Sequence, residues 1–182
     1  MTSECFFERF DTPIGVLTIA ADANGLRHIE FPSNRHPVDR AHWRAGAHGA
    51  IADTLLATRT QLLEYFAGKR KTFDLPLAPA GTLFQCEVWR TLATIAYGQT
   101  RSYRDLARAI GKPEAMRAVG AANGRNPLPI VLPCHRVIGA DGRLVGFGGG
   151  LPIKIALLRL EGARFVEDAE SDGSTKTADL FG

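Results

Sequence analysis

Three prolines between positions 127 and 133 constrain this 182-residue chain more than any other feature of its sequence. A proline ring fixes its own φ and biases the preceding residue toward extended backbone, so the segment from Asn126 to Pro133 is expected to be stiff. It leads into the sequence Pro133-Cys134-His135-Arg136. We therefore expect Cys134 to lie on a rigid turn, at a set distance from the residues that precede the segment.

Cys134 beside His135 has the parts of an activated nucleophile. The thiolate is the reactive form of cysteine, and a free cysteine at neutral pH is mostly thiol. An adjacent imidazole can take the proton, directly or through one water, and leave a strong sulfur nucleophile. These two residues alone leave the alternative open, because a lone cysteine is more often a small buried hydrophobe. Cys5 and Cys86 have no histidine or aspartate partner at useful spacing, and we interpret them as structural.

The composition is that of an ordinary globular protein, with 45% hydrophobic and 23% charged residues. The first residues carry charges where a signal peptide needs an apolar run, and no stretch has the length of a membrane span. Three cysteines at irregular spacing argue against a disulfide framework and for a reducing compartment. These features predict a cytoplasmic protein.

Positive charge is concentrated around the cysteine motif. Residues 86–165 hold 12 Lys and Arg against 5 Asp and Glu, whereas the rest of the chain holds 10 against 14. Binding to a polyanion such as nucleic acid requires this kind of asymmetry. A solvated basic face is the alternative reading, so the charge alone favours nucleic acid only modestly.

The first half of the chain predicts a small β-sheet with a helix. Short apolar, partly alternating runs occupy residues 5–10, 14–20 and 26–31, and strong turn signals separate them. A loop is expected over 32–48, a helix over 50–67 and an extended linker over 69–81. The helix would bury one face that carries Ile51, Leu55, Leu62 and Phe66.

The second half predicts helices. Thr82 and Gln85 resemble a capping box that starts a helix ending at Tyr97-Gly98. Two short helices, 102–110 and 113–123, are joined by a turn at Gly111 and match the helix-turn-helix pattern. Ser102 with Asp105 can cap the first of them. A last helix is expected over 152–161, with Ile155, Leu158 and Leu151 facing inward, and residues 167–182 form a polar tail.

Few other residues carry chemistry on their own. The second short helix is rich in small residues around Arg117, which suits close approach to a backbone or minor groove, although tight helix packing explains it as well. Glu161 could orient the imidazole of His135 as the third member of a relay. Asn126 is first read as a structural bridge between turns. The histidines form no recognisable metal-ligand pattern with the cysteines, and the glycine-rich segment 146–150 lacks the context of a nucleotide fingerprint.

Taken together, several motifs resemble the O6-alkylguanine-DNA alkyltransferases, also called methylated-DNA–protein-cysteine methyltransferases. The motifs are Arg117-Ala118-Val119-Gly120, Asn126-Pro127, the segment from Pro133 to Gly139, and Gly149-Gly150. The likeness runs in order over about residues 82–161 and continues more weakly through residues 11–15. It implies an α/β (α+β) fold: a ribonuclease-H-like β/α domain over 1–78, and a helical DNA-binding and alkyl-transfer domain with a winged helix-turn-helix over 79–166.

The resemblance also implies an activity and a set of roles. The chain would flip an O6-alkylguanine out of double-stranded DNA and accept its alkyl group irreversibly, with O4-alkylthymine open as a second substrate. It would need no cofactor. The oligomeric state is open, with a monomer as the default expectation. The implied catalytic residues are Cys134 as acceptor, His135 as base through a water, Glu161 as its orienting partner, Asn126 as the tie to the helix-turn-helix, and Tyr103 as proton donor. DNA would contact Arg117, Ala118, Ala121, Tyr103 and Arg104, and the base pocket would include Val137, Val145 and Phe147.

Two departures from the family pattern matter. Phe147 stands where the family commonly has tyrosine, so a hydroxyl near the bound base is missing. Asp22 and Arg27 stand where some members have zinc ligands, so no metal is expected. The alternatives are a non-catalytic relative that flags alkylated DNA, a helix-turn-helix transcription regulator, and a cysteine hydrolase. The first lacks the cysteine that this chain has, the second leaves Pro133–Arg136 unexplained, and the third needs an oxyanion hole that we cannot locate.

Overall fold

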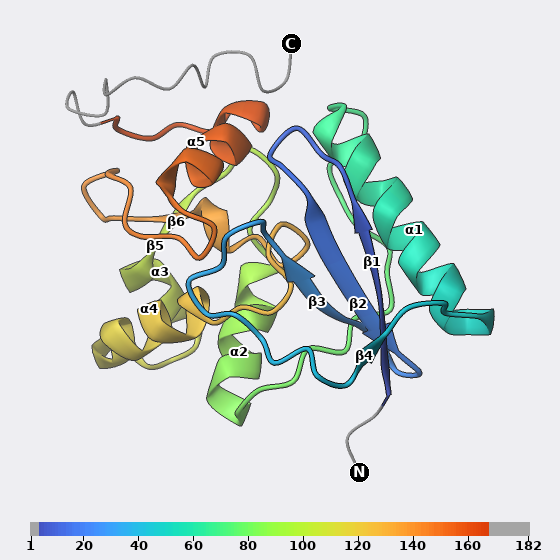
Figure 1. Cartoon of the computed structure of the whole chain (residues 1–182). Helices are drawn as coiled ribbons and strands as arrows, with labels where there is room; N and C mark the ends of the chain where they lie inside the picture. Colours follow the sequence, from blue (N-terminus) through green and yellow to red (C-terminus); the bar gives the residue numbers. More distant parts are fainter. Residues whose placement is uncertain (1–3, 168–182) are drawn as a thin grey trace.

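Four strands form a sheet in the first half of the chain, and the structure, a computed structural model, describes residues 4–167. The strands are β1 (Cys5–Phe10), β2 (Leu17–Asp22), β3 (Gly25–Glu30) and β4 (Trp43–Arg44). Their order is β3-β2-β1-β4, with β4 parallel to β1 and the other pairs antiparallel. Helix α1 (Gly49–Phe66) packs along one face of this sheet (Figure 1). The predicted sheet with a helix is confirmed.

The predicted loop over residues 32–48 contains the short strand β4, which the sequence did not indicate. Trp43 of this strand stacks near Phe7 and His28, with ring centroids 6.2 and 5.4 Å away. Two residues are too few to show the alternating pattern from which a strand is predicted. The packing of the indole against the sheet, a tertiary contact, accompanies the pairing of this segment with β1.

The second half is helical, as predicted. Its helices are α2 (Leu83–Leu92), α3 (Tyr103–Ala109), α4 (Met116–Gly124) and α5 (Leu151–Leu160), with 3-10 turns at Pro113–Ala115 and Cys134–Arg136. Two-residue strands β5 (Arg101–Ser102) and β6 (Val137–Ile138) pair in parallel beside the α3–α4 pair. Both predicted capping boxes form: Thr82 with Gln85 starts α2, and Ser102 with Asp105 starts α3.

Helix α2 ends earlier than the predicted stop at Tyr97-Gly98. Its last residue is Leu92, and the backbone tightens there, since the N–H of Ile95 donates to the carbonyl of Leu92 at 3.0 Å. The side chain of Ile95 is still buried, so the apolar stripe continues beyond the helix. The periodicity of apolar residues therefore overstated the helix length.

Helix α5 departs from its predicted face. Leu158 is fully buried, as predicted, but Leu151 is exposed and Ile155 is only half-buried. Leu157 and Lys154 are fully buried instead. Sequence analysis rarely predicts that a lysine is buried, because a buried ammonium needs several hydrogen-bond partners.

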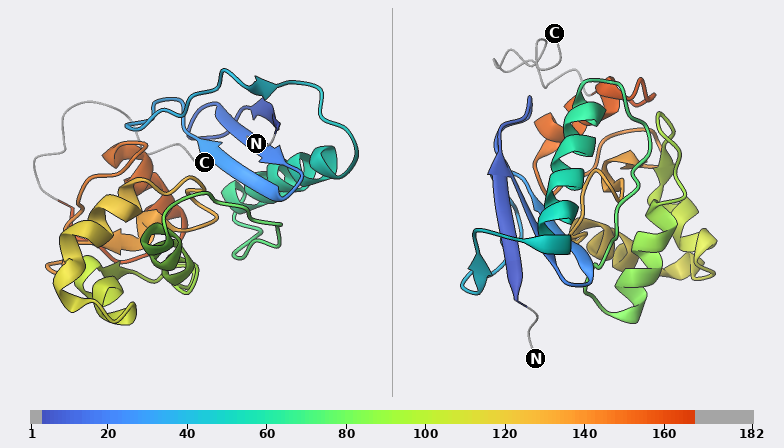
Figure 2. Two further views of the ribbon diagram at one scale, coloured as in Figure 1. Left: turned by 90° about the horizontal axis from the view of Figure 1, so that it is seen from below. Right: turned by 90° about the vertical axis from the view of Figure 1, so that its right-hand side faces the viewer.

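Backbone hydrogen bonds join the two halves along the free edge of β3. Leu26 donates to the carbonyl of Pro76 at 2.7 Å, so the linker after α1 covers part of this edge. Ile29 donates to the carbonyl of Pro127 at 2.9 Å, so the proline-rich segment covers the rest. Figure 2 shows the sheet and α1 on one side, with α3, α4 and α5 on the other. The domain boundary predicted between residues 78 and 79 falls in the linker between α1 and α2. It stays a prediction.

Within residues 4–167 no helix is long and apolar enough to cross a membrane. Residues 168–182 of the predicted polar tail lie outside the described part of the chain.

Two neighbouring leucines of α1 test the packing against the sheet. Leu62 is fully buried, and Leu63 is 42% exposed. We expect Leu62→Ala to lower the free energy of unfolding by about 2–5 kcal/mol, because it removes buried methyl groups and leaves a cavity. Leu63→Ala should change it by less than about 0.5 kcal/mol. Urea unfolding followed by circular dichroism measures both, and equal losses would contradict the packing of α1.

Candidate active site

Cys134 begins a 3-10 turn at the end of the proline-rich segment, and hydrogen bonds hold that segment in a fixed shape. The amide of Asn126 donates to the carbonyl of Leu132 at 2.6 Å, and its oxygen accepts from the N–H of Leu128 at 3.0 Å. The backbone N–H of Cys134 also donates to the carbonyl of Leu132, at 2.7 Å. Asn126 thus bridges the two ends of the segment, which fits the structural role expected for it.

Ile130 in the middle of this segment has a φ of +74°. A β-branched residue rarely adopts the left-handed region, and such a conformation persists only where the surroundings enforce it. Here Ile130 is fully buried between prolines on both sides. The strained backbone is thus part of what fixes the position of Cys134.

Glu161, the C-cap of α5, receives five hydrogen bonds from four residues. Its Oε1 accepts from His135 Nε2 at 2.7 Å, from the hydroxyl of Tyr65 at 2.7 Å and from Arg136 at 2.9 Å. Its Oε2 accepts from Arg136 at 2.8 Å and from the N–H of Gly98 at 3.1 Å. The structure therefore brings Glu161 and His135 together, as the sequence suggested.

The protonation states in this network follow from burial and its partners. Burial alone would raise the pKa of Glu161, but the hydrogen bonds from His135 and Arg136 and the positive charge of Arg136 outweigh it and lower this pKa to about 2. Burial lowers the pKa of His135, against the opposite effect of Glu161, so the imidazole is neutral at pH 7. An ionised carboxylate can only accept, so the imidazole proton sits on Nε2.

The remaining nitrogen of His135 is therefore free to take a proton. Nδ1 is buried and makes no hydrogen bond to any residue between 4 and 167. With the proton on Nε2, Nδ1 carries a lone pair and can act as a general base. Glu161 would also stabilise the imidazolium that forms when this base is protonated.

Cys134 rests as a thiol. Its side chain is buried, and burial raises its pKa to about 11, although the Asn126 side chain and the charge of Lys154 act in the opposite direction. The sulfur is therefore not a preformed thiolate, and its proton must leave when it reacts.

Lys154 is the functional candidate that sequence reasoning missed. Its ammonium is buried and donates to the carbonyls of Val137 and Val145 at 2.6 and 2.9 Å. Burial lowers its pKa to about 8, while the negative charge that Cys134 can carry raises it. Lys154 thus ties the strand after the cysteine turn to the loop at Val145 and places a positive charge near the sulfur. No sequence motif marks it, because its partners are backbone carbonyls.

Tyr103, the first residue of α3, lies near Cys134. Burial and the negative charge of Cys134 raise the pKa of Tyr103 to about 12, against a smaller opposite effect of Asn123. Its phenol therefore keeps its proton at neutral pH and can donate it. The ring also lies close to Gly120 of α4, where an added Cβ would meet it at 3.7 Å.

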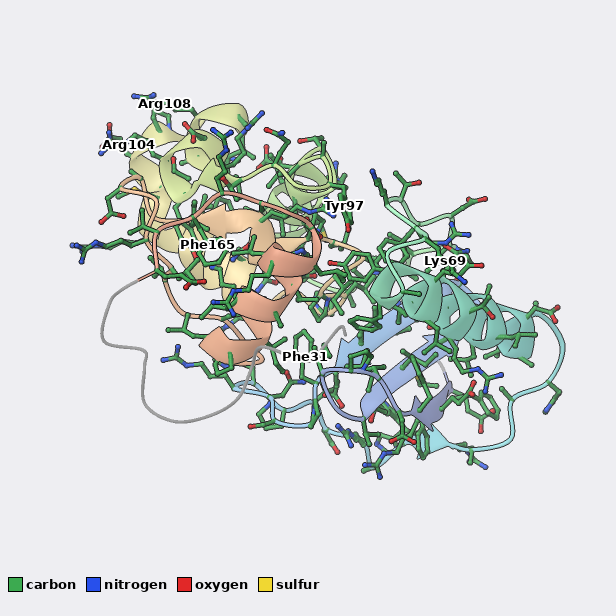
Figure 3. The ribbon with its side chains drawn as sticks, turned by 90° about the horizontal axis from the view of Figure 1, so that it is seen from above. Phe31, Lys69, Tyr97, Arg104, Arg108 and Phe165 are labelled. Atoms are coloured by element: carbon green, nitrogen blue, oxygen red, sulfur yellow. The ribbon has the colours of Figure 1, made fainter. Side chains whose placement is uncertain are left out.

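Cys134 opens into a cavity of about 180 Å³ between the two halves of the molecule. Phe147 and Phe31 both line it and pack with ring centroids 5.4 Å apart. Figure 3 places Phe31 at the junction of the sheet half and the helical half. A Cβ at Gly149 would lie 2.6 Å from the Phe31 ring, so this contact requires a glycine. Phe31 is a second residue that the sequence did not single out, since only the tertiary fold brings it to the cysteine.

A wider groove of about 630 Å³ lies outside this cavity. Five of the predicted DNA-binding or pocket residues besides Phe147 line it: Tyr103, Arg104, Arg117, Ala121 and Val145. Five residues line both spaces and form the boundary between the groove and the cysteine cavity: His36, Gly124, Arg125, Phe147 and Gly148. Ala118 is exposed on α4, and Val137 is fully buried; neither is among the residues that line these two spaces.

Two family models match the chain. The model described as "6-O-methylguanine DNA methyltransferase, ribonuclease-like domain" matches residues 6–79. The model described as "6-O-methylguanine DNA methyltransferase, DNA binding domain" matches residues 83–163.

Relatives of similar length match most of the chain. A methylated-DNA–protein-cysteine methyltransferase of Methanosarcina barkeri is 45% identical over 86% of this chain and 96% of its own. One of Mycobacterium bovis is 46% identical over 89% and 95%. Among solved structures, Mycobacterium tuberculosis OGT in complex with DNA is similar with a TM-score of 0.80 at 45% identity, covering 86% of this chain and 92% of that one.

The Glu161 network predicts a pH-dependent loss of stability. A carboxylate whose folded-state pKa is lowered stabilises the fold above its unfolded pKa, and this contribution disappears as pH falls through about 2. Glu161→Gln should lower the free energy of unfolding by about 3–5 kcal/mol at pH 7. The deficit should shrink between about pH 5 and pH 2.

Urea unfolding at a series of pH values measures this deficit. Glu167→Gln is the matched control, because Glu167 pairs with Arg159 at the surface. A deficit of Glu161→Gln that stays constant down to pH 2 would show that the charge of the carboxylate is not what stabilises the network.

Lys154→Met should lower stability by about 1–3 kcal/mol for each carbonyl left without its donor. It should also move the pH at which the Cys134 thiol reacts upward, because the charge of Lys154 lowers the pKa of that thiol. Iodoacetamide labelling of the Cys134 peptide, followed by mass spectrometry across pH, measures this shift. Lys69→Met, at an exposed lysine of the other half, is the control. An unchanged pH profile would limit Lys154 to a packing role.

Proposed function

This chain belongs to the 6-O-methylguanine DNA methyltransferase family, and from that membership we propose that Cys134 is the residue that accepts the alkyl group. The chain is a methylated-DNA–protein-cysteine methyltransferase: it binds DNA and repairs it directly by transfer of the alkyl group to a cysteine. One observation carries the assignment to Cys134. Of the cysteines in the chain, it alone lies beside a neutral imidazole whose tautomer is fixed by a buried carboxylate.

The transfer forms one bond and breaks another. The sulfur of Cys134 attacks the alkyl carbon, the S–C bond forms, and the C–O6 bond breaks with its electron pair on guanine. His135 Nδ1 takes the thiol proton through a water, and Glu161 stabilises the resulting imidazolium. Tyr103 donates a proton to the leaving guanine and becomes a phenolate. The proton held by His135 neutralises this phenolate through water, so the products are a neutral base and a thioether. Hydrolysis does not restore a thiol from a thioether, so each molecule acts once.

The cavity arrangement supports a flipped substrate. O6 lies on the major-groove side of guanine, so a protein that approaches through the minor groove cannot reach it inside the stack. The cavity that holds Cys134 shares Phe147 and Gly148 with the wider groove, which suits a nucleotide turned out of the duplex. Arg117 is exposed on α4 at the groove and would occupy the space that the base leaves. The small residues of α4, Ala118 and Ala121 among them, would let this helix lie close to the minor groove.

The finer points on partners stay proposals. The DNA is double-stranded and carries O6-alkylguanine, and the protein acts as a monomer. The cytoplasmic location predicted from the cysteines also stays a prediction.

Incubation with a duplex that contains O6-methylguanine tests the acceptor. We expect the Cys134 peptide to gain one methyl group per protein molecule in mass spectrometry, and no gain with an unmodified duplex. Cys134→Ser should abolish the transfer and keep salt-dependent DNA binding. Cys86→Ser, at a cysteine that does not line the cavity, should keep the transfer. A folded, DNA-bound protein with an unmodified Cys134 peptide would overturn the assignment.

A further inference from the structure

Three arginines line a surface groove, and only Arg104 among them is a residue that the family resemblance already implied as a DNA contact. Arg101 precedes α3, and Arg104 and Arg108 lie on it four residues apart, which places the latter two on one helix face. All three are exposed and line a groove of about 380 Å³ between the start of α3 and residues 138–142. Figure 3 shows Arg104 and Arg108 extending from the same outer end of the helical half.

The positive charge of this groove is not neutralised within the described chain. Arg104 and Arg108 form no ion pair with any residue between 4 and 167. Asp105 also lines the groove, but its carboxylate accepts from the N–H and hydroxyl of Ser102 at 2.9 and 2.7 Å as part of the α3 capping box. Three guanidinium groups therefore face one carboxylate that is already engaged.

This groove continues the wider groove outside the cysteine cavity. Arg104, Gly139 and Ala140 line both. A DNA strand whose flipped nucleotide enters past Phe147 would leave the wider groove over these shared residues. The next phosphates along that strand would then lie at Arg104, Arg108 and Arg101.

We propose that Arg101, Arg104 and Arg108 form a phosphate-binding track for the DNA strand beyond the flipped nucleotide. The inference rests on the proposed function, because it places the strand by the position of that nucleotide. Guanidinium groups bind phosphate oxygens with paired, charge-assisted hydrogen bonds. Such contacts carry no sequence information, so the track adds affinity and register for any sequence around the lesion.

The salt dependence of DNA binding tests the track. Each phosphate contact to duplex DNA contributes about −0.9 to the slope of log K against log salt concentration. Arg101→Gln with Arg108→Gln should therefore reduce the magnitude of this slope by about 1.8. Fluorescence anisotropy with an unmodified duplex over a range of potassium chloride concentrations measures it, and thermal unfolding establishes that the variant is folded.

The control removes the same charge elsewhere. Arg9→Gln with Lys69→Gln also deletes two positive charges, from the exposed surface of the sheet half. We expect its slope to stay within about 0.5 of the unaltered protein, since neither residue would contact phosphate. Equal reductions in the two double variants would overturn the track and leave only an effect of net charge. An unchanged slope in both double variants would also overturn the track.

This measurement does not depend on alkyl transfer. If Cys134 is methylated but the two double variants reduce the salt slope equally, the proposed function stands and the track does not. A reduced slope in a protein that methylates no cysteine would support the track as a DNA contact and overturn the proposed acceptor.

Discussion

The buried carboxylate of Glu161 is the interaction on which the rest of the structure depends. An ionised carboxylate in a protein interior is stable only when its oxygens are hydrogen-bonded and its charge is balanced. Glu161 meets this need with donors from α1, from the turn at Gly98 and from the cysteine turn. Gly98 is required there, because it has a φ of +75° and an added Cβ would lie 2.9 Å from the carbonyl of Glu161. The network therefore fixes three distant segments relative to the end of α5.

The same network determines the chemistry of the cysteine turn. Glu161 assigns the imidazole proton of His135 to Nε2 and leaves Nδ1 as a base. The thiol of Cys134 rests protonated in its buried setting, so a base must take its proton when the sulfur reacts. Burial thus protects the sulfur from unproductive reactions, while Lys154 keeps a positive charge near it. A sulfur nucleophile that is used only once benefits from such protection.

The active-site cavity belongs to neither half of the molecule alone. The proline-rich segment accepts a hydrogen bond from β3 at its edge, and Phe31 from the sheet half packs on Phe147 from the helical half. The sheet half therefore shapes the space around the sulfur, although every residue with a proposed chemical role comes from the helical half. The ring of Phe147, at the position where the family commonly has tyrosine, packs against Phe31 of the sheet half.

The sequence by itself determined the features that depend on near neighbours. Both capping boxes, the stiff segment before Cys134 and the adjacency of His135 were predictable, because their interactions join residues a few positions apart. Glu161 was a candidate from its place at a helix end, but only the fold supplies its other partners. The burial of Lys154 and the approach of Phe31 to the cysteine were decided by tertiary structure alone. Their contacts are made to backbone carbonyls or to residues about a hundred positions away, and such contacts leave no periodicity or spacing in the sequence.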